Sequence, residues 1–524
     1  MKKERIKLLA VIAGAVLFNL IFWQEKMAVN TILYDVFILA MLFFLYPEAR
    51  RVSTVRWLTL GHLFCLAMIL VQNTLLSKIG FSITLVLLAG FIEYVHRSVW
   101  FAGGSMLING VFVTVSVMES AERKTNGSKK KWNGKIVRFA IIPLVLVLIF
   151  FFIYSSANSV FSDYTSRISS SISTFFNDLF KLFSIPRLMF LLAGSYLTAW
   201  IIMRSRLNYF EKKESNCEDD LVRKRKSTAE KKNDVFYNLS TGVMGKMAKG
   251  NLALKNMNTI GLISLVLLNV LLAVINVIDV RYIWFGFEYG SDVNLFKMIH
   301  EGTDLLIISI LLAIAVLMVF FRGNLNFYKA NKWLKYGAYA WIVQNAILVI
   351  SVLLRDYYYI NKTGLAYKRI GVLFYLALVL AGLASVFWKI YRKKTTYFLF
   401  RVNAWAVIVL LVASTAINWD EFIAEYNFSR NKEILMPVDY MVTLSNKALP
   451  LLDQNREVLK EQAAKQITFY GYLSPTCEGC FLGELDRRQK QYLEQQQGYT
   501  WLSYNMADAS IKKYFEQKRK LTAK

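Results

Sequence analysis

The feature that most constrains this chain is a series of uninterrupted apolar blocks. Blocks of about 17–22 residues recur until about residue 417, and each is long enough as a helix to cross a hydrocarbon core of roughly 30 Å. Strands of a transmembrane β-barrel would instead alternate apolar and polar residues over about 10 positions. With 56% hydrophobic and 19% charged residues, the chain is predicted to be an all-α polytopic membrane protein.

The apolar blocks predict about 11 transmembrane helices. Short clusters of Lys and Arg lie between them, and Lys2, Lys3, Arg5 and Lys7 precede the first. By the positive-inside rule these clusters face the cytoplasm, so we expect a multi-pass protein of the bacterial cytoplasmic (inner) membrane with its N-terminus inside. The predicted helices are 8–23, 31–46, 57–71, 79–95, 139–155, 187–203, 259–280, 303–321, 336–354, 370–390 and 402–417.

One further apolar segment, residues 98–118, does not fit this count. Gly103 and Gly104 interrupt it, and Asn109 lies inside it. If it crossed the membrane, the basic loop that follows would lie outside, against the positive-inside rule. We therefore predict a re-entrant or interfacial segment.

Four parts follow from this topology. They are an N-terminal membrane half (1–203), a basic cytoplasmic loop (204–255), a C-terminal membrane half (256–418) and an extracytoplasmic tail (419–524). In the tail, 451–466 and 483–497 have helix-forming composition, and 467–473 has the composition of a short strand. Residues 156–182 read as an amphipathic segment on the outer surface.

The formal net charge of +27 does not indicate a nucleic-acid partner. No recognition motif accompanies it, and basic loops that meet anionic lipid headgroups account for it. The expected partners are the lipid bilayer and a protein that binds the C-terminal tail.

The string RGNLNFYKANKWLKYGAYAWIVQNAILVIS, from Arg322 to Ser351, resembles a bacterial polytopic membrane family catalogued as domain of unknown function 4173. The segment Gly364–Gly371 (GLAYKRIG) also resembles that family. The resemblance covers about 262–427. It implies a membrane architecture and supplies no activity.

Polar residues recur inside the predicted helices of the second half. Such residues are costly in lipid and usually face the bundle interior, so they are candidates for a polar path or ligand pocket. The alternative is that they hydrogen-bond between helices for about 0.6 kcal/mol each. The set consists of Asn269, Asn276, Gln344, Asn345, Ser351 and Asn403.

A second candidate site lies at the predicted outer ends of the same helices. Its mixture of acids, bases and tyrosines could bind a polar headgroup or a peptide, or it could anchor the helices at the interface. The candidate residues are Asp279, Arg281, His300, Glu301, Asp304, Arg355, Asp356, Lys368 and Arg369.

Cys477 and Cys480 form the one CxxC motif. The tail holds no further Cys and no His, which argues against a zinc site. A disulfide or a pair of thiols in an oxidising compartment is the simplest interpretation, and a redox dithiol is the alternative. No hydrolase, metalloprotease or phosphate-loop motif occurs, so we expect no catalytic residues, cofactor or metal.

Three functions remain open. The first is a non-enzymatic sensor, scaffold or envelope component with a partner-binding outer tail. The second is a transporter or flippase-like protein with a polar path through the second half. The third is an enzyme that acts on a lipid-linked substrate through His300, Glu301 or Asp304.

Overall fold

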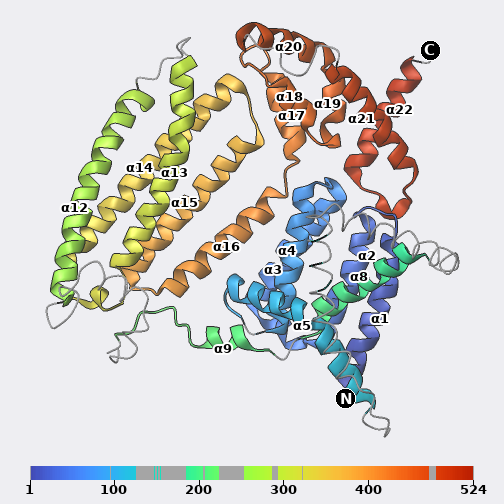
Figure 1. Ribbon diagram of the computed structural model, residues 1–524, viewed down its shortest axis with the longest axis horizontal. Helices are drawn as coiled ribbons and strands as arrows, with labels where there is room; N and C mark the ends of the chain where they lie inside the picture. Colours follow the sequence, from blue (N-terminus) through green and yellow to red (C-terminus); the bar gives the residue numbers. More distant parts are fainter. Residues whose placement is uncertain are drawn as a thin grey trace. The chain divides into compact units, whose positions relative to one another are not determined.

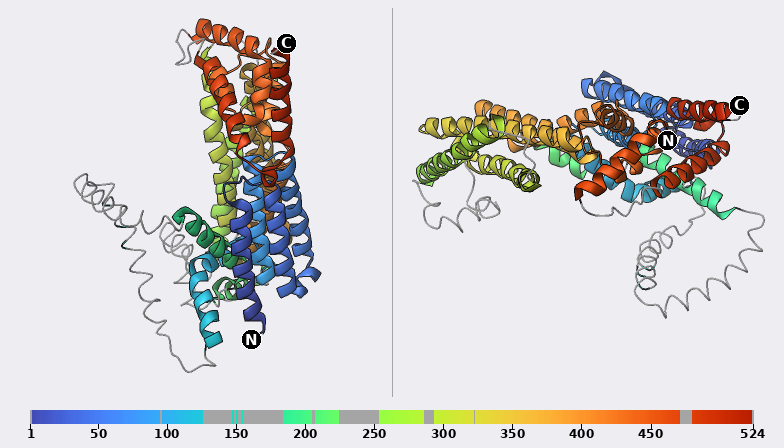
Figure 2. Two further views of the ribbon diagram at one scale, coloured as in Figure 1. Left: turned by 90° about the vertical axis from the view of Figure 1, so that its right-hand side faces the viewer. Right: turned by 90° about the horizontal axis from the view of Figure 1, so that it is seen from above.

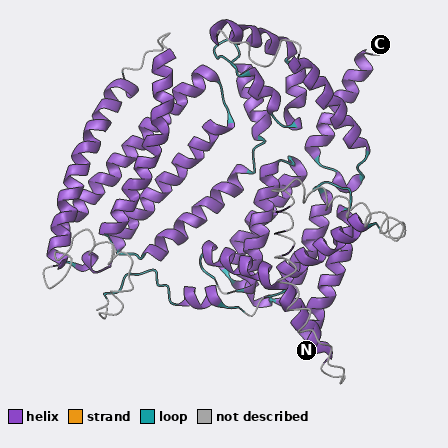
Figure 3. Cartoon of the chain, viewed as in Figure 1, coloured by secondary structure: helices purple, strands orange, loops and turns teal. Residues whose placement is uncertain are grey.

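A computed structural model of the chain describes most of its residues. These are 2–94, 96–125, 184–204, 207–223, 253–285, 293–321, 323–470 and 480–522, with the single positions 147, 150 and 154. Within these ranges the chain is helical and has no strand (Figure 3). One isolated bridge joins Asp220 to Lys394. The predicted helix at 139–155 and the predicted amphipathic segment at 156–182 lie essentially outside the described residues.

The chain divides into two compact units. Unit 1 comprises 1–214 and 497–509, and unit 2 comprises 215–496 and 510–524. The helices of unit 1 are α1 (Lys2–Phe22), α2 (Val29–Leu45), α3 (Ser53–Val71), α4 (Leu75–Glu93), α5 (Val99–Thr125), α8 (Ile185–Ile202) and α9 (Tyr209–Ser215, whose last residue belongs to unit 2), with the short 3₁₀ turns η1 (Pro47–Arg51) and η6 (Trp501–Ser503).

Helices α1 and α8 of unit 1 pack closely because two glycines leave room for larger side chains. A Cβ at Gly194 would lie 2.6 Å from the Phe18 ring, and one at Gly14 would lie 2.4 Å from Thr198. Small residues at helix contacts are typical of membrane bundles. The Tyr34 hydroxyl adds a 2.8 Å hydrogen bond to Thr198, which ties α2 to α8.

The segment predicted to be broken at Gly103 and Gly104 is the continuous helix α5, so the break is wrong. Both glycines lie inside the helix, and a Cβ at Gly104 would lie 2.8 Å from the Phe210 ring. Gly104 therefore serves close packing, which sequence alone does not separate from helix breaking.

Unit 2 begins with a bundle of long helices, namely α12 (Ala253–Asp279), α13 (Val293–Phe320), α14 (Lys332–Thr363), α15 (Tyr367–Arg392) and α16 (Thr396–Ser414). The π-helical turn η3 (Val280–Trp284) continues α12, and η4 (Gly323–Phe327) lies before α14. Helix α14 contacts α12, α13 and α15 (Figure 1, Figure 2). Its position in the middle of the bundle makes it the organising helix of unit 2.

Shorter helices follow the bundle in unit 2. These are α17 (Trp419–Ser429), α18 (Val438–Thr443), η5 (Asn446–Ala448), α19 (Leu449–Gln454), α20 (Arg456–Tyr470), α21 (Cys480–Gln497) and α22 (Met506–Thr522, whose first residues belong to unit 1). They share one hydrophobic core that includes Ile360, Leu365 and Ile370 from the turn between α14 and α15. The predicted helices at 451–466 and 483–497 are present. The strand predicted at 467–473 is wrong for residues 467–470, because these residues belong to α20.

Eight described helices are long and apolar enough to cross a membrane, which makes the chain a multi-pass membrane protein. They are 3–22, 53–71, 75–93, 185–202, 254–284, 332–363, 367–392 and 396–414. The predicted helices at 31–46 and 303–321 correspond to the shorter apolar stretches Val29–Leu45 and Leu306–Phe320. The predicted count of 11 is therefore matched only in part.

The first part of the basic loop, residues 207–223 with Arg204, contains several ion pairs. In unit 2, Asp219 accepts a hydrogen bond from Arg401 at 2.6 Å, and Asp220 accepts one from Lys394 at 2.6 Å. In unit 1, Arg204 pairs with Glu211 at 2.7 Å. The acidic residues of this loop thus neutralise nearby basic ones.

Candidate functional site

The intramembrane polar residues meet mainly along one seam between α12 and α14. Gln344 Nε2 donates to Asn269 Oδ1 at 2.8 Å, and Asn269 in turn donates to the carbonyl of Gly337 at 3.0 Å. Two turns further along, Asn276 donates to the carbonyl of Gln344 at 3.1 Å. The seven-residue spacing of Asn269 and Asn276 places both on one face of α12, as the sequence predicted.

The seam continues to the ends of both helices. Ser351 accepts a hydrogen bond from the Trp284 ring at 3.0 Å, and Tyr358 donates to the carbonyl of Ile283 at 3.1 Å. Between these contacts, Arg355 Nη2 lies 2.5 Å from Asp279 Oδ1. Amides in the middle and an ion pair near the end are the order expected where the helices approach the headgroup region.

Two members of the predicted polar set lie elsewhere. Asn345 is buried and donates to the carbonyl of Trp341 in its own helix at 2.7 Å. Asn403 of α16 donates to Ser385 of α15 at 2.8 Å. The structure therefore brings the predicted residues together across α12 and α14, and not across α12, α14 and α16.

The predicted outer cluster separates into smaller groups. Arg369 is buried, donates to the carbonyl of Thr363 at 3.1 Å and lies over the Tyr359 ring. Asp356 of α14 is also buried, whereas Lys368 and Arg281 are exposed. His300, Glu301 and Asp304 belong to α13, and their side chains lie outside what the structure describes.

Most of the motif Cys477–Cys480 lies outside the described residues. Cys477 lies outside the described residues, and of Cys480 only its position as the first residue of α21 is described. Among the described residues, no group of three or more His, Cys, Asp or Glu side chains could hold a metal ion.

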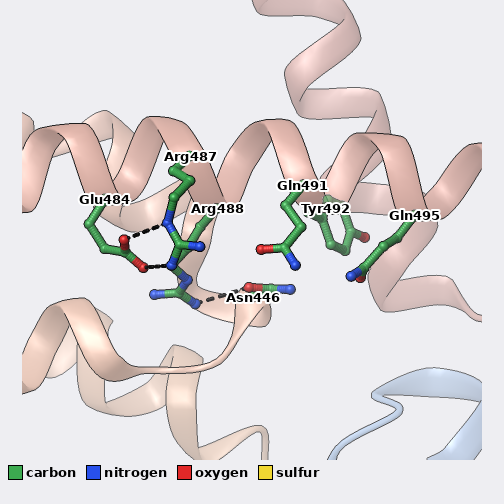
Figure 4. A pocket seen from close by; sticks show the side chains of 7 residues that line it. All are labelled: Asn446, Glu484, Arg487, Arg488, Gln491, Tyr492 and Gln495. Atoms are coloured by element: carbon green, nitrogen blue, oxygen red, sulfur yellow. Dashed lines mark hydrogen bonds and ion pairs between the residues drawn. The ribbon is translucent and has the colours of Figure 1, made fainter.

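A polar pocket of about 270 Å³ lies on the C-terminal helices of unit 2 (Figure 4). Arg488 forms its base and donates to the carbonyls of Val442 and Leu444 and to Asn446 Oδ1. Burial lowers the pKa of Arg488 below its ordinary value, yet a guanidinium remains charged. The lining residues are Asn446, Glu484, Arg487, Arg488, Gln491, Tyr492 and Gln495.

The exposed side of this pocket combines an ion pair with amide side chains that can both donate and accept hydrogen bonds. Arg487 pairs with Glu484 through two nitrogens, at 2.8 and 2.7 Å. Gln491 and Gln495 lie one turn apart on α21, and in Figure 4 both extend to the side of this helix on which Asn446 lies. Such amides suit the polar backbone of a peptide.

A buried Ser–His–Glu group in unit 1 was not predicted. His96 Nε2 lies 2.7 Å from Ser105 Oγ, and His96 Nδ1 lies 2.6 Å from Glu214 Oε2. The second oxygen of Glu214 accepts from the backbone N–H of Ser98 at 2.8 Å. Serine hydrolases use this order of groups, but Ser105 is 5% exposed and substrate would not reach it. The group fastens α9 to the turn between α4 and α5.

A second unpredicted group joins the middle of three membrane helices of unit 1. His62 of α3 lies 2.9 Å from Asp35 of α2 and 2.9 Å from Thr84 of α4. All three side chains are fully buried. A histidine and an aspartate inside two apolar blocks were the available signal, but their contact depends on how the helices pack.

One family model matches the chain over residues 8–455, and its description is a domain of unknown function, DUF4153. The chain belongs to this family. The resemblance to domain of unknown function 4173 is therefore wrong about which family it is, although both are families of unknown function. No curated protein and no solved structure matches the chain.

The family match in this DUF4153 protein extends from α1 to the end of α19. It includes the α12–α14 seam and Asn446 of the pocket. It ends before α21, which carries the other pocket residues. The membrane helices are thus the common part, and the pocket lies mostly beyond it.

Proposed function

We propose that this DUF4153 protein is a non-enzymatic sensor or scaffold of the bacterial cytoplasmic membrane. In this proposal its C-terminal helices lie outside the cytoplasm and bind a polar segment of a partner protein. The observation that carries the proposal is the pocket on α21, where amide and guanidinium groups line an accessible surface.

The chemistry of the pocket favours a peptide with acidic groups. Arg487 and Arg488 against Glu484 leave the lining with one excess positive charge, and Arg487 is the exposed member of the pair. Guanidinium groups bind carboxylates through paired hydrogen bonds. The amides of Asn446, Gln491 and Gln495 would then pair with the backbone of the peptide.

Contacts within each unit support an outer location of the C-terminal helices. In unit 2, Asn427 of α17 accepts from the N–H of Leu365 at 2.6 Å and donates to its carbonyl at 2.9 Å. In unit 1, Lys26 pairs with Asp508, and Thr500 donates its N–H to Glu25 at 3.2 Å. The distribution of Lys and Arg predicts an outer position for both contacted turns, α14–α15 and α1–α2.

The test is site-specific photocrosslinking in intact cells. A benzophenone side chain at Gln491 should give a discrete crosslinked product, and Arg487→Ala with Gln495→Ala in the same chain should reduce that product at least fivefold. A benzophenone at Lys512, on the exposed face of α22, is the matched control. Equal products at both positions, or no product at Gln491, would remove the proposal.

Transport is the second candidate function, and one observation favours it. The α12–α14 seam contains buried polar atoms that have no hydrogen-bond partner, including Asn276 Oδ1, Asp279 Oδ2 and Arg355 Nε. A polar solute or a file of water could satisfy them. Proteoliposomes that move a solute with the native chain, and at least tenfold more slowly with Gln344→Leu, would support transport over scaffolding.

A further inference from the structure

The strongest unexplained feature of unit 1 is the buried group Asp35, His62 and Thr84. His62 lies at the midpoint of α3 (Ser53–Val71), and Thr84 lies at the midpoint of α4 (Leu75–Glu93). Both helices are long enough to span a membrane. The group therefore lies near the middle of the hydrocarbon layer, where an ionisable side chain is costly and marks a functional pathway more often than elsewhere.

The hydrogen bonds indicate which nitrogen of His62 carries a proton. The Thr84 hydroxyl has one hydrogen and lies within donating distance of the carbonyls of Gly80 at 2.7 Å and Phe81 at 3.0 Å. It can then only accept from His62 Nδ1, which lies 2.9 Å away. Nδ1 is therefore the protonated nitrogen. The hydrogen bond of one ring nitrogen determines the protonation of the other, so Nε2 of a neutral ring carries no proton.

It follows that Asp35 and His62 share a proton. His62 Nε2 lies 2.9 Å from Asp35 Oδ1, and two unprotonated acceptors would repel each other at that distance. Either Asp35 is a carboxylic acid that donates to a neutral ring, or the ring is an imidazolium beside a carboxylate. Both arrangements have zero net charge, which is the state that a low dielectric favours.

The group also has a position for a second proton. Asp35 Oδ2 is buried and has no hydrogen-bond partner. If the acid proton of Asp35 moves to Oδ2, then Oδ1 becomes an acceptor, and Nε2 can take up an incoming proton while it still bonds to Oδ1. The Phe81 ring, stacked on the imidazole with centroids 4.9 Å apart, would face the resulting cation favourably.

We propose that Asp35 and His62 form a proton-binding site in the membrane core of unit 1. The pair holds one proton at rest and takes up a second at Nε2. The added charge makes α2, α3 and α4 respond to proton concentration. This proposal rests on unit 1 alone and is independent of partner binding by the C-terminal helices.

The other titratable and charged groups of these helices are few. Tyr34 of α2 bonds to Thr198, Cys65 lies one turn after His62, and Arg56, Lys78 and Glu93 lie toward the ends of α3 and α4. Asp35 Oδ1 lies 2.9 Å from His62 Nε2. The titration of His62 therefore reports on Asp35 more than on any other of these groups.

The experiment uses the full chain in lipid nanodiscs, purified through a tag without histidine. The chain has three histidines, so His96→Gln with His300→Gln leaves His62 as the one observable ring. Nitrogen NMR of histidine-labelled protein from about pH 8 to about pH 5 should show Nδ1 protonated throughout and Nε2 gaining a proton. Asp35→Asn in this background should weaken the uptake of this proton at least tenfold.

Two results would overturn the proposal. One is a ring protonated at Nε2 and not at Nδ1 at high pH, and the other is proton uptake at Nε2 that Asp35→Asn leaves unchanged. If a variant does not fold, the native chain still decides, because one of its three rings must show the predicted protonated Nδ1 and titrating Nε2. Thr84→Val offers a further check, since loss of the acceptor should let the proton move between the two nitrogens.

Discussion

Asp35 in unit 1 and Asp279 in unit 2 are both buried carboxylates in apolar helices, but their partners differ. Asp35 faces a histidine at 2.9 Å, whereas Asp279 faces Arg355 at 2.5 Å. Arginine keeps its charge at every accessible pH, and histidine can lose its charge near neutrality. The ion pair of unit 2 is therefore a permanent contact, and the pair of unit 1 is one that can change its proton content.

The neighbouring polar residues extend this difference. In unit 2 the amides of Asn269, Asn276 and Gln344 bridge two helices, and amides do not titrate. In unit 1 the proton on His62 is fixed by Thr84 and shared with Asp35. The same cost of polar groups in lipid thus gives a structural seam in one unit and a titratable group in the other.

The largest expected effect is on the ion pair of unit 2. Arg355→Met leaves the Asp279 carboxylate buried without its counter-charge, which should lower the free energy of unfolding by about 3 kcal/mol. The measurement is reversible unfolding in lipid bicelles. Arg355→Met with Asp279→Leu should recover more than half of that loss, and strictly additive losses would mean that the two charges do not depend on each other.

The next largest effect concerns the α14–α15 turn, which contacts the C-terminal helices of unit 2. Gly364 has φ +79°, and a Cβ there would lie 2.5 Å from Asn427 Oδ1. Gly364→Ala should therefore cost about 2 kcal/mol through the left-handed backbone and the displaced Asn427. Gly371→Ala is the control, because a Cβ there meets nothing within 4 Å, and that change should be neutral or slightly stabilising. Equal losses in both variants would contradict the account.

A comparable effect should depend on pH in the C-terminal helices. Burial would raise the pKa of Asp453, but hydrogen bonds from Lys518, Tyr514 and Arg456 outweigh it and hold the pKa below its ordinary value. The contribution of Asp453 to stability is thus complete above about pH 4 and is lost as pH falls through the folded-state pKa.

Asp453→Asn should lower the stability of these helices by about 2 kcal/mol at neutral pH. It should also remove part of their acid sensitivity, which hydrogen exchange in α19 and α22 measures. Glu461→Gln breaks an exposed pair with Lys465 and serves as the control without a measurable effect. An acid transition that Asp453→Asn leaves unchanged would assign the sensitivity to another group.

The smallest expected effect is in the amide seam. A double-mutant cycle with Asn269→Leu and Gln344→Leu should give a coupling free energy of about 0.6 kcal/mol, the average for hydrogen bonds between membrane helices. A coupling near zero would indicate that each amide finds another partner in the variant, and the contrast with the ion pair of Arg355 would then be larger still.

The sequence predicts the helical class, most spans and the polar face of α12 because those features repeat at a fixed local period. The seven-residue step from Asn269 to Asn276 is visible without any structure. The contacts of His62 and His96 are not, since they join residues 27 and 118 positions away. No local pattern encodes a contact between helices whose packing is unknown.

Glycine caused the clearest error of interpretation for the same reason. Gly103 and Gly104 have the composition of a helix break, but they lie inside α5, where Gly104 makes room for Phe210. The family resemblance failed differently. Most of its string lies in α14, whose polar and apolar pattern suits many membrane helices, so it indicated the architecture but not the correct family.

The proposed function depends most on which side of the membrane carries the C-terminal helices. In a chain with Cys65, Cys217, Cys477 and Cys480 replaced by serine, Gln491→Cys tests the pocket and Lys329→Cys tests the α13–α14 turn. The account predicts that a membrane-impermeant maleimide labels Gln491→Cys in intact spheroplasts and labels Lys329→Cys only after lysis. Labelling of Gln491→Cys only after lysis would place the pocket in the cytoplasm and contradict the proposal that it binds an outer partner.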